Sequence, residues 1–167
     1  MFVCLFCVWA PPAPVYPARG LGEAASAAFL AFVRSGVVPA EFPTGDSAEA
    51  QQWLSIRLLR AVNLPAPPAT ISLIGARVAP YPGGPAAFLI YDAQGKRVAL
   101  LVRPLDAPPA RAPRLLVADG RDAAVWTWRG QGLALVGDLD AASLLKIADD
   151  LFEPRPEAAQ TIPERGS

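Results

Sequence analysis

Two cysteines near the start of the chain have the spacing of redox pairs and of half zinc sites. Cys4 and Cys7 are separated by two residues. A redox pair needs a preceding strand and a helix N-terminus that lowers the thiol pKa, and the first seven residues provide neither. A zinc site needs further ligands, but the sequence has no third cysteine and no histidine. We therefore predict ordinary apolar roles for both cysteines, with no metal and no cofactor bound.

The absence of histidine also removes the commonest general base and the usual partner of a serine or cysteine nucleophile. Only a Ser-Lys arrangement would remain for a hydrolase, and neither Lys96 nor Lys146 has a serine in a suitable context. Asp149 and Asp150 are adjacent, so on a helix they point about 100° apart and do not form an acid–base pair. The sequence predicts a protein that is not an enzyme.

The charge balance argues against a second group of functions. Fifteen Lys and Arg residues against fifteen Asp and Glu residues give zero formal net charge, so no overall field draws the chain to nucleic acid. Pro82 precedes Gly83 and Gly84, but no phosphate-binding motif surrounds the pair, which predicts a turn. Arginines near the expected hairpins fit either an anion-binding patch or solvated strand edges, and we favour the edges: Arg97, Arg103, Arg111, Arg114, Arg121 and Arg129.

Aromatic residues on one expected strand suggest a shared face. Trp126 and Trp128 alternate with Val125 and Thr127, so both indoles point to the same side, where Tyr91 or Trp53 could join them. Two interpretations remain, an aromatic-lined ligand site and a sheet face packed under helices. Core packing is favoured.

Two segments have the periodicity of amphipathic helices. Residues 46–62 begin with Asp46 as a cap and Glu49 three residues later, and residues 140–152 begin with Asp138 or Asp140 as a cap. Pro154 ends the second helix. The first helix has an apolar stripe in which we expect Trp53 to be buried: Ala50, Trp53, Leu54, Leu58, Ala61 and Val62. Residues 22–33 have helix formers first and strand formers last, which leaves their structure open.

Residues 71–136 predict short strands joined by turns and by a Pro-rich loop at 104–113. The connections are too short for the crossover helices of a parallel sheet. The expected strands are 71–79, 86–91, 98–103, 115–118, 123–128 and 132–136. The predicted fold class is therefore α+β, with an antiparallel sheet of about five or six strands covered by the two amphipathic helices.

The length of 167 residues predicts one domain, over residues 21–152. Residues 1–20 form an apolar and then Pro-rich N-terminal segment, and residues 153–167 have the composition of a disordered tail. Residues 1–10 are uncharged and apolar but too few to span a bilayer. Three origins stay open for them, and we favour the end of a membrane span over a degenerate signal peptide or a misplaced start codon. Membrane association through residues 1–10 is thus part of the expectation.

Several motifs resemble, in order over about residues 24–152, the extracytoplasmic domain of proteobacterial membrane-anchored anti-sigma factors. Those domains follow the pattern "WLSxRLG…LVGGRLLP…GPAAxLMYED…LTLYVR…FYW…GYALxG…LL". The matching positions, which we expect to be mostly structural, are Trp53, Leu54, Arg57, Gly75, Arg77, Pro85, Ala86, Tyr91, Trp126, Trp128, Gly132, Leu135 and Gly137.

The resemblance implies a non-enzymatic regulatory or sensory domain on the periplasmic side of the inner membrane. It implies a protein partner in the envelope or a membrane-linked regulator. The sequence lacks the cytoplasmic sigma-binding region and the complete transmembrane helix of that family, and it has no His in the stretch that matches Phe29 to Phe42. A secreted or periplasmic ligand-binding protein unconnected to sigma factors is the alternative.

Overall fold

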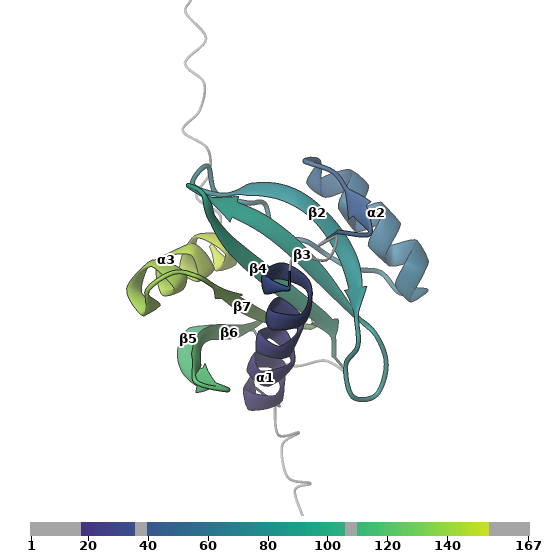
Figure 1. Cartoon of the computed structure of the whole chain (residues 1–167). Coiled ribbons are helices and arrows are strands. Elements are labelled where there is room, and N and C mark those ends of the chain that lie inside the picture. The colour runs from purple at the N-terminus through teal and green to yellow at the C-terminus, as the bar shows by residue number, and fades with distance from the viewer. Residues whose placement is uncertain (1–17, 36–39, 106–109, 154–167) are drawn as a thin grey trace, which may run out of the picture.

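The computed structural model describes residues 18–35, 40–105 and 110–153. They form an antiparallel sheet with helices on both of its faces (Figure 1). The α+β class predicted from the sequence is confirmed. The strands are β1 (Phe42–Pro43), β2 (Ser72–Ala79), β3 (Ala86–Ala93), β4 (Lys96–Pro104), β5 (Arg111–Ala118), β6 (Arg121–Trp128) and β7 (Gln131–Gly137).

The sheet has the order β1-β2-β3-β4-β7-β6-β5, and every neighbouring pair is antiparallel. Hairpins join β2 to β3, β3 to β4, β5 to β6 and β6 to β7, whereas β4 lies beside β7. The three two-residue turns carry Gly95, Gly120 and Gly130, whose positive φ angles suit glycine. The structure therefore contains the six expected strands and adds the two-residue β1.

Both faces of the sheet are buried, which explains why its central strands are apolar throughout rather than alternating. On one face β3 contributes Leu89 and Tyr91 to a core that α2 (Ser47–Leu58) and α3 (Ala141–Phe152) cover. On the other face it contributes Phe88 and Ile90 to a second core. Two separate apolar layers therefore hold the sheet from either side.

The second core lies under a helix that the sequence left open. α1 (Ala18–Phe29) packs across β4, β7, β6 and β5, and a π-helical turn, Leu30–Arg34, follows it (Figure 1). Gly22 lies where an added Cβ would come within 2.8 Å of the Leu116 side chain, so helix and sheet are in close contact there. The expected two covering helices thus become three.

Both helices predicted from the sequence begin where expected, but the first of them ends earlier than predicted. Asp46 caps α2 by accepting hydrogen bonds from the N–H groups of Ala48 and Glu49, and Asp140 caps α3. The expected helix 46–62, however, ends at Leu58. The loop that follows is held in place by a hydrogen bond that the Val62 N–H donates to the Ser55 hydroxyl.

A side chain of the sheet completes that loop. Gln131 is buried, accepts from the Asn63 N–H and donates to the Asn63 carbonyl. Val62 still reaches the core, but from a loop instead of a helix. The Pro-rich loop expected at 104–113 is also shorter than predicted, because β4 extends to Pro104 and β5 begins at Arg111. A bulge between Arg111 and Arg114 accommodates Pro113.

Candidate functional site

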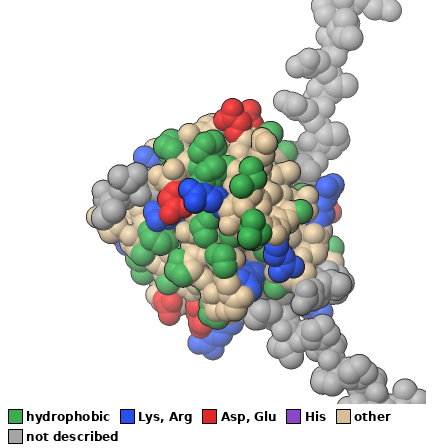
Figure 2. Space-filling model, turned by 90° about the vertical axis from the view of Figure 1, so that its right-hand side faces the viewer, with side chains coloured by type: hydrophobic (Ala, Val, Ile, Leu, Met, Phe, Trp, Pro, Cys, Tyr) green, Lys and Arg blue, Asp and Glu red, His purple; other side chains and the backbone are tan. Residues whose placement is uncertain are grey.

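The outer surface of α2 exposes large apolar side chains. α2 buries only Ala50 and Leu54, while Ile56 is 64% exposed and Leu59, the residue that ends the helix, is 89% exposed. Figure 2 shows the side of the molecule on which α2 lies, where hydrophobic side chains are interspersed with charged ones. We call Ile56 and Leu59 the α2 knob. The sequence analysis did not predict this exposed surface. The available indication was that neither Ile56 nor Leu59 belongs to the apolar stripe of the predicted helix.

Leu59 also has an unfavourable backbone. Its φ of 52° is in the left-handed region, where its N–H bonds to the carbonyl of Ile56 and closes the helix. Glycine is the usual residue at this position, because a Cβ there costs about 1 kcal/mol or more. A strained leucine that points into solvent brings no packing benefit to the isolated domain.

Trp53 is half-buried, not fully buried as expected from the stripe. Its ring stacks on that of Phe42 with centroids 5.4 Å apart and an interplanar angle of 8°. The guanidinium of the exposed Arg57 lies 5.2 Å from the Trp53 ring centroid. Because Phe42 belongs to β1, this stack ties α2 to the edge of the sheet. Leu54, the next residue of the motif, is buried in the core.

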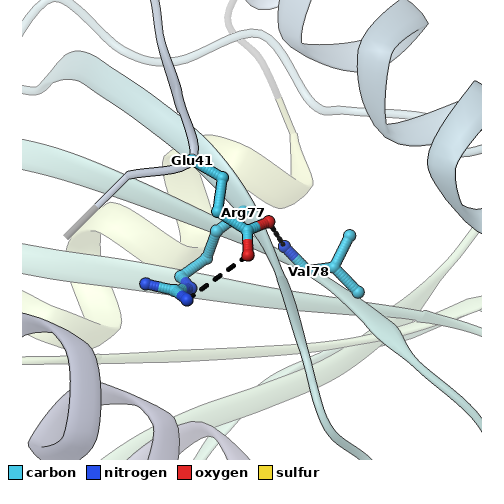
Figure 3. Close-up of polar contacts among 3 residues, drawn as sticks. All are labelled: Glu41, Arg77 and Val78. Atoms are coloured by element: carbon cyan, nitrogen blue, oxygen red, sulfur yellow. Dashed lines mark hydrogen bonds and ion pairs between the residues drawn. The ribbon is translucent and has the colours of Figure 1, made fainter. Parts of the chain in front are cut away.

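Arg77 links three segments through its guanidinium, which makes its role structural. It forms an ion pair with Glu41 at 3.4 Å, and the same carboxylate accepts a hydrogen bond of 3.1 Å from the Val78 N–H (Figure 3). The Arg77 Cζ lies 3.7 Å from the centroid of the Phe32 ring in the π-helical turn. The Arg77 side chain thus connects β2 to Glu41 and to Phe32 in the π-helical turn.

The glycines of the motif allow close approach of strands. A Cβ on Gly75 would lie 2.7 Å from the Ala40 Cβ and from the Phe42 carbonyl oxygen, and one on Gly137 would lie 2.9 Å from the Arg97 carbonyl oxygen. Gly132 is buried in β7 and pairs with Arg103 and Thr127. The apolar motif positions Ala86 and Leu135 are fully buried. These residues build the sheet.

The aromatic residues of the motif belong to the core. Trp126 and Trp128 lie on the same face, as predicted, and Trp126 and Tyr91 are buried beneath α2 and α3 while Trp128 is partly buried. The Tyr91 hydroxyl has no hydrogen-bond partner among the described residues, and burial raises the pKa of this hydroxyl far above 10.0. Core packing is thus the better of the two interpretations, since neither of the two cavities described below is lined by these rings.

The arginines do not converge on one patch. Arg103 donates to the carbonyls of Gly83 and Gly84 and stacks over Tyr81 at 4.5 Å, next to the exposed Pro85. Burial raises the pKa of Tyr81, and the nearby Arg103 charge partly offsets that increase. The others are spread over different contacts: Arg97 pairs with Asp92, Arg121 lies over Phe29, and Arg129 lies over Trp128.

A cleft of about 510 Å³ runs along α1 and is mostly apolar. It lies between the small residues of the helix and the turn after β2, with lining residues that include Ala24, Ala27, Ala31, Phe32, Pro80 and Pro82. A second, smaller cavity of about 90 Å³ lies beside Leu58, Arg60 and Arg103. The α1 cleft is large enough for a small apolar ligand.

The other predicted sites are separate from these surfaces. Asp149 and Asp150 lie on α3, where Asp150 pairs with Lys146 at 3.2 Å. Cys4, Cys7 and the apolar residues 1–10 lie outside the described residues, as does the tail from 154 onward. Among the described residues, no group of three or more His, Cys, Asp or Glu side chains is placed to hold a metal ion. No helix in that part of the chain is long and apolar enough to cross a membrane.

Comparison with known proteins gives little. No family model and no curated protein matches this chain. A chain of the solved MucA/MucB complex of Pseudomonas aeruginosa is similar to it, at 15% identity and with a TM-score of 0.40. The match covers 52% of this chain and 32% of the other, so this chain corresponds to about a third of that length. Similarity at this level supports no argument about function.

Proposed function

We propose that this chain is a non-enzymatic regulatory domain of the cell envelope that acts by binding a protein partner, as the periplasmic part of an anti-sigma factor would. The observation that carries the proposal is the α2 knob. Ile56 and Leu59 expose apolar surface at the C-terminal end of α2, and Leu59 does so from a left-handed backbone conformation. Apolar side chains that are surrounded by polar ones are typical anchors of protein interfaces.

Two further features support this proposal. Several motif residues have structural roles in the sheet or in the attachment of α2: Leu54, Gly75, Arg77 and Trp126. Because these residues are used for folding, the exposed knob is the better candidate for contact with a partner. Arg57 and Arg60 are exposed beside Ile56 and Leu59. The partner therefore presents an apolar groove with acidic residues at its rim, because the knob is flanked by two guanidinium groups that form no ion pair within the described part of the chain.

The test is a transcriptional reporter for envelope-stress sigma factors in cells that overproduce the chain. The unsubstituted chain changes reporter output, and Ile56→Lys abolishes the change because it puts a charge into an apolar contact. Gln52→Lys is the matched control, since Gln52 is exposed on the same helix and the substitution adds the same charge. The proposal fails if reporter output does not respond to the chain, or if both variants act like the unsubstituted protein.

The α1 cleft supports an alternative, a ligand-binding envelope protein unconnected to sigma factors. Its apolar lining would suit an acyl or aromatic ligand. Ala27→Trp would fill the cleft from an exposed helix position, whereas Ile56→Lys would leave it unchanged. The alternative gains if a fluorescent fatty acid binds the chain and Ala27→Trp abolishes that binding without affecting the reporter.

A further inference from the structure

The smaller of the two cavities borders the α2 knob. Its walls come from the end of α2 and Arg60 just beyond it, from the turn between β2 and β3, and from the end of β4. Leu58 and Arg60 both line the cavity, and Leu59 of the knob lies between them in the sequence. A partner that contacts the knob therefore comes within reach of this cavity.

The size of the cavity limits what it can hold. Its volume of about 90 Å³ is several times the space that one water molecule needs, but it is far below the roughly 300 Å³ of the smaller pockets that bind free ligands. A nucleotide, a sugar or an acyl chain would not fit, whereas the end of one side chain would. The cavity thus suits a side chain that belongs to a larger partner.

Two guanidinium groups give the cavity a positive charge. Arg60 is exposed, and its side chain forms no ion pair with any carboxylate of the described residues. Arg103 is held in place by neutral groups, because it donates to the carbonyl oxygens of Gly83 and Gly84 and lies 4.5 Å from the centroid of the Tyr81 ring. Neither charge is balanced within the part of the chain that the structure describes, so the cavity attracts an anion.

The remaining walls favour a carboxylate on a short aliphatic stem. Leu58, Pro85 and Pro104 supply apolar surface for the stem. A free guanidinium group such as that of Arg60 binds both oxygens of a carboxylate through two parallel hydrogen bonds. A phosphate group has nearly two charges and three acceptor oxygens, and it would need donors that Arg103 already directs to the glycine carbonyls. One carboxylate therefore matches the available donors better than a phosphate.

We propose that this cavity receives the carboxylate of an aspartate or glutamate side chain from the partner that binds the α2 knob. Arg60 forms the bidentate pair with this carboxylate, and Arg103 supplies a second, fixed positive charge. The assignment rests on the proposed binding function of the knob. It adds a specific requirement to that function, because the partner must carry an acidic side chain next to the apolar surface that covers Leu59.

Acetate is the simplest probe of the cavity, since it is a carboxylate on a single methyl group. The full chain is titrated with sodium acetate at constant ionic strength, and NMR follows the backbone amides of Leu58, Gly83 and Gly84. The expected result is saturable shifts with a dissociation constant on the order of 10 mM. Sodium phosphate, titrated in the same way, is expected to bind no more tightly than acetate.

Two variants with the same change of charge test the role of Arg60. Arg60→Gln is expected to raise the acetate dissociation constant about tenfold or more, because it removes a charged hydrogen-bond donor. Arg57→Gln is the matched control, since Arg57 is also exposed near the end of α2 but lies over Trp53 and does not line the cavity. It should leave the dissociation constant unchanged.

The envelope-stress reporter connects the cavity to the partner. Arg60→Gln is expected to lose most of the effect that the unsubstituted chain has on the reporter, and Arg57→Gln is expected to keep most of it, because a solvated charge at a rim contributes little. A reporter that does not respond to the unsubstituted chain would refute the proposed function. The acetate titration decides independently of that result whether the cavity binds a carboxylate.

Four results would overturn the carboxylate site. The first is an acetate titration without saturation, and the second is an equal loss of binding in Arg60→Gln and Arg57→Gln. The third is phosphate binding tenfold tighter than acetate binding. The fourth is acetate binding that appears only in Asp106→Asn, because it would assign the cavity to a carboxylate of the chain itself; Asp106 lies outside the described residues. A reporter effect that Ile56→Lys abolishes and Arg60→Gln leaves intact would show that the partner does not use the cavity.

Discussion

Leu59 shows a direct conflict between backbone preference and side-chain environment. It adopts a left-handed φ of 52°, and its side chain is 89% exposed. Stability alone would select glycine at the end of α2. The proposed binding function depends on this exposed leucine, which adds no packing to the domain itself.

Leu59→Gly is therefore expected to raise the free energy of unfolding by about 0.5 to 1 kcal/mol, because it relieves the left-handed strain and loses almost no packing. Urea unfolding measures the change. Ile56→Gly is the control: it is similarly exposed but lies inside the helix, where glycine costs about 1 kcal/mol. A loss of stability in both variants would contradict the argument about Leu59.

Gly75 tests whether motif glycines are needed for strand approach. Gly75→Ala is expected to lower the free energy of unfolding by about 1 to 3 kcal/mol, because its Cβ would meet the Ala40 Cβ and Phe42 carbonyl oxygen at 2.7 Å. Gly45→Ala is the matched control, since its nearest contact would be 3.7 Å away. It should change stability by less than about 0.5 kcal/mol in thermal or urea unfolding.

Because Tyr91 is buried, we expect the free energy of unfolding to fall at alkaline pH in the unsubstituted protein and to fall less in Tyr91→Phe. Its pKa is raised in the folded state by burial, so the folded protein retains the neutral phenol while the unfolded chain ionises near 10.0. The stability that the neutral form contributes is fully present below pH 10.0 and is lost as the pH rises above it. At about pH 11 the loss is about 1.4 kcal/mol. Tyr91→Phe lacks this loss, so urea unfolding of both proteins at about pH 8 and about pH 11 measures it as a difference. Equal losses in the two proteins would contradict it.

At the scale of elements, α2 is attached more weakly than α1 or α3. It buries only Ala50 and Leu54 and packs on β2 and β3, and the stack of Trp53 on Phe42 adds a contact to the sheet edge. The apolar stripe and the Asp46 cap made the helix predictable from the sequence. Its early end was not predictable, because it depends on Ser55 and Gln131 holding the loop that follows.

Trp53→Ala is expected to lower the free energy of unfolding by about 1.5 to 3 kcal/mol. This is less than for a fully buried tryptophan, because the ring is half-exposed and the loss is mainly the stack on Phe42. Trp53→Phe retains an aromatic partner and should lose about half as much. Urea unfolding of the two variants measures the difference. A change below about 0.5 kcal/mol in both would make Trp53 a binding residue with no structural role.

At the scale of the whole molecule, local sequence patterns predicted the strands but did not predict which helices cover the two faces of the sheet. Short apolar runs and turn residues predict β2, β3, β4, β6 and β7 closely. The local sequence of residues 22–33 does not indicate that this segment covers the second face of the sheet. The helix α1 is stabilised by burying that apolar face, which would otherwise be exposed. The same holds for the α2 knob, which is defined by the absence of packing against Ile56 and Leu59 within the described residues.

The proposed binding function requires Leu59 to contribute to binding at the expense of stability. The decisive measurement is therefore the reporter output of Leu59→Gly alongside its free energy of unfolding. We expect a protein that is more stable, by about 0.5 to 1 kcal/mol, and that has lost most of its effect on the envelope-stress reporter. A protein that is more stable and fully active would contradict the claim.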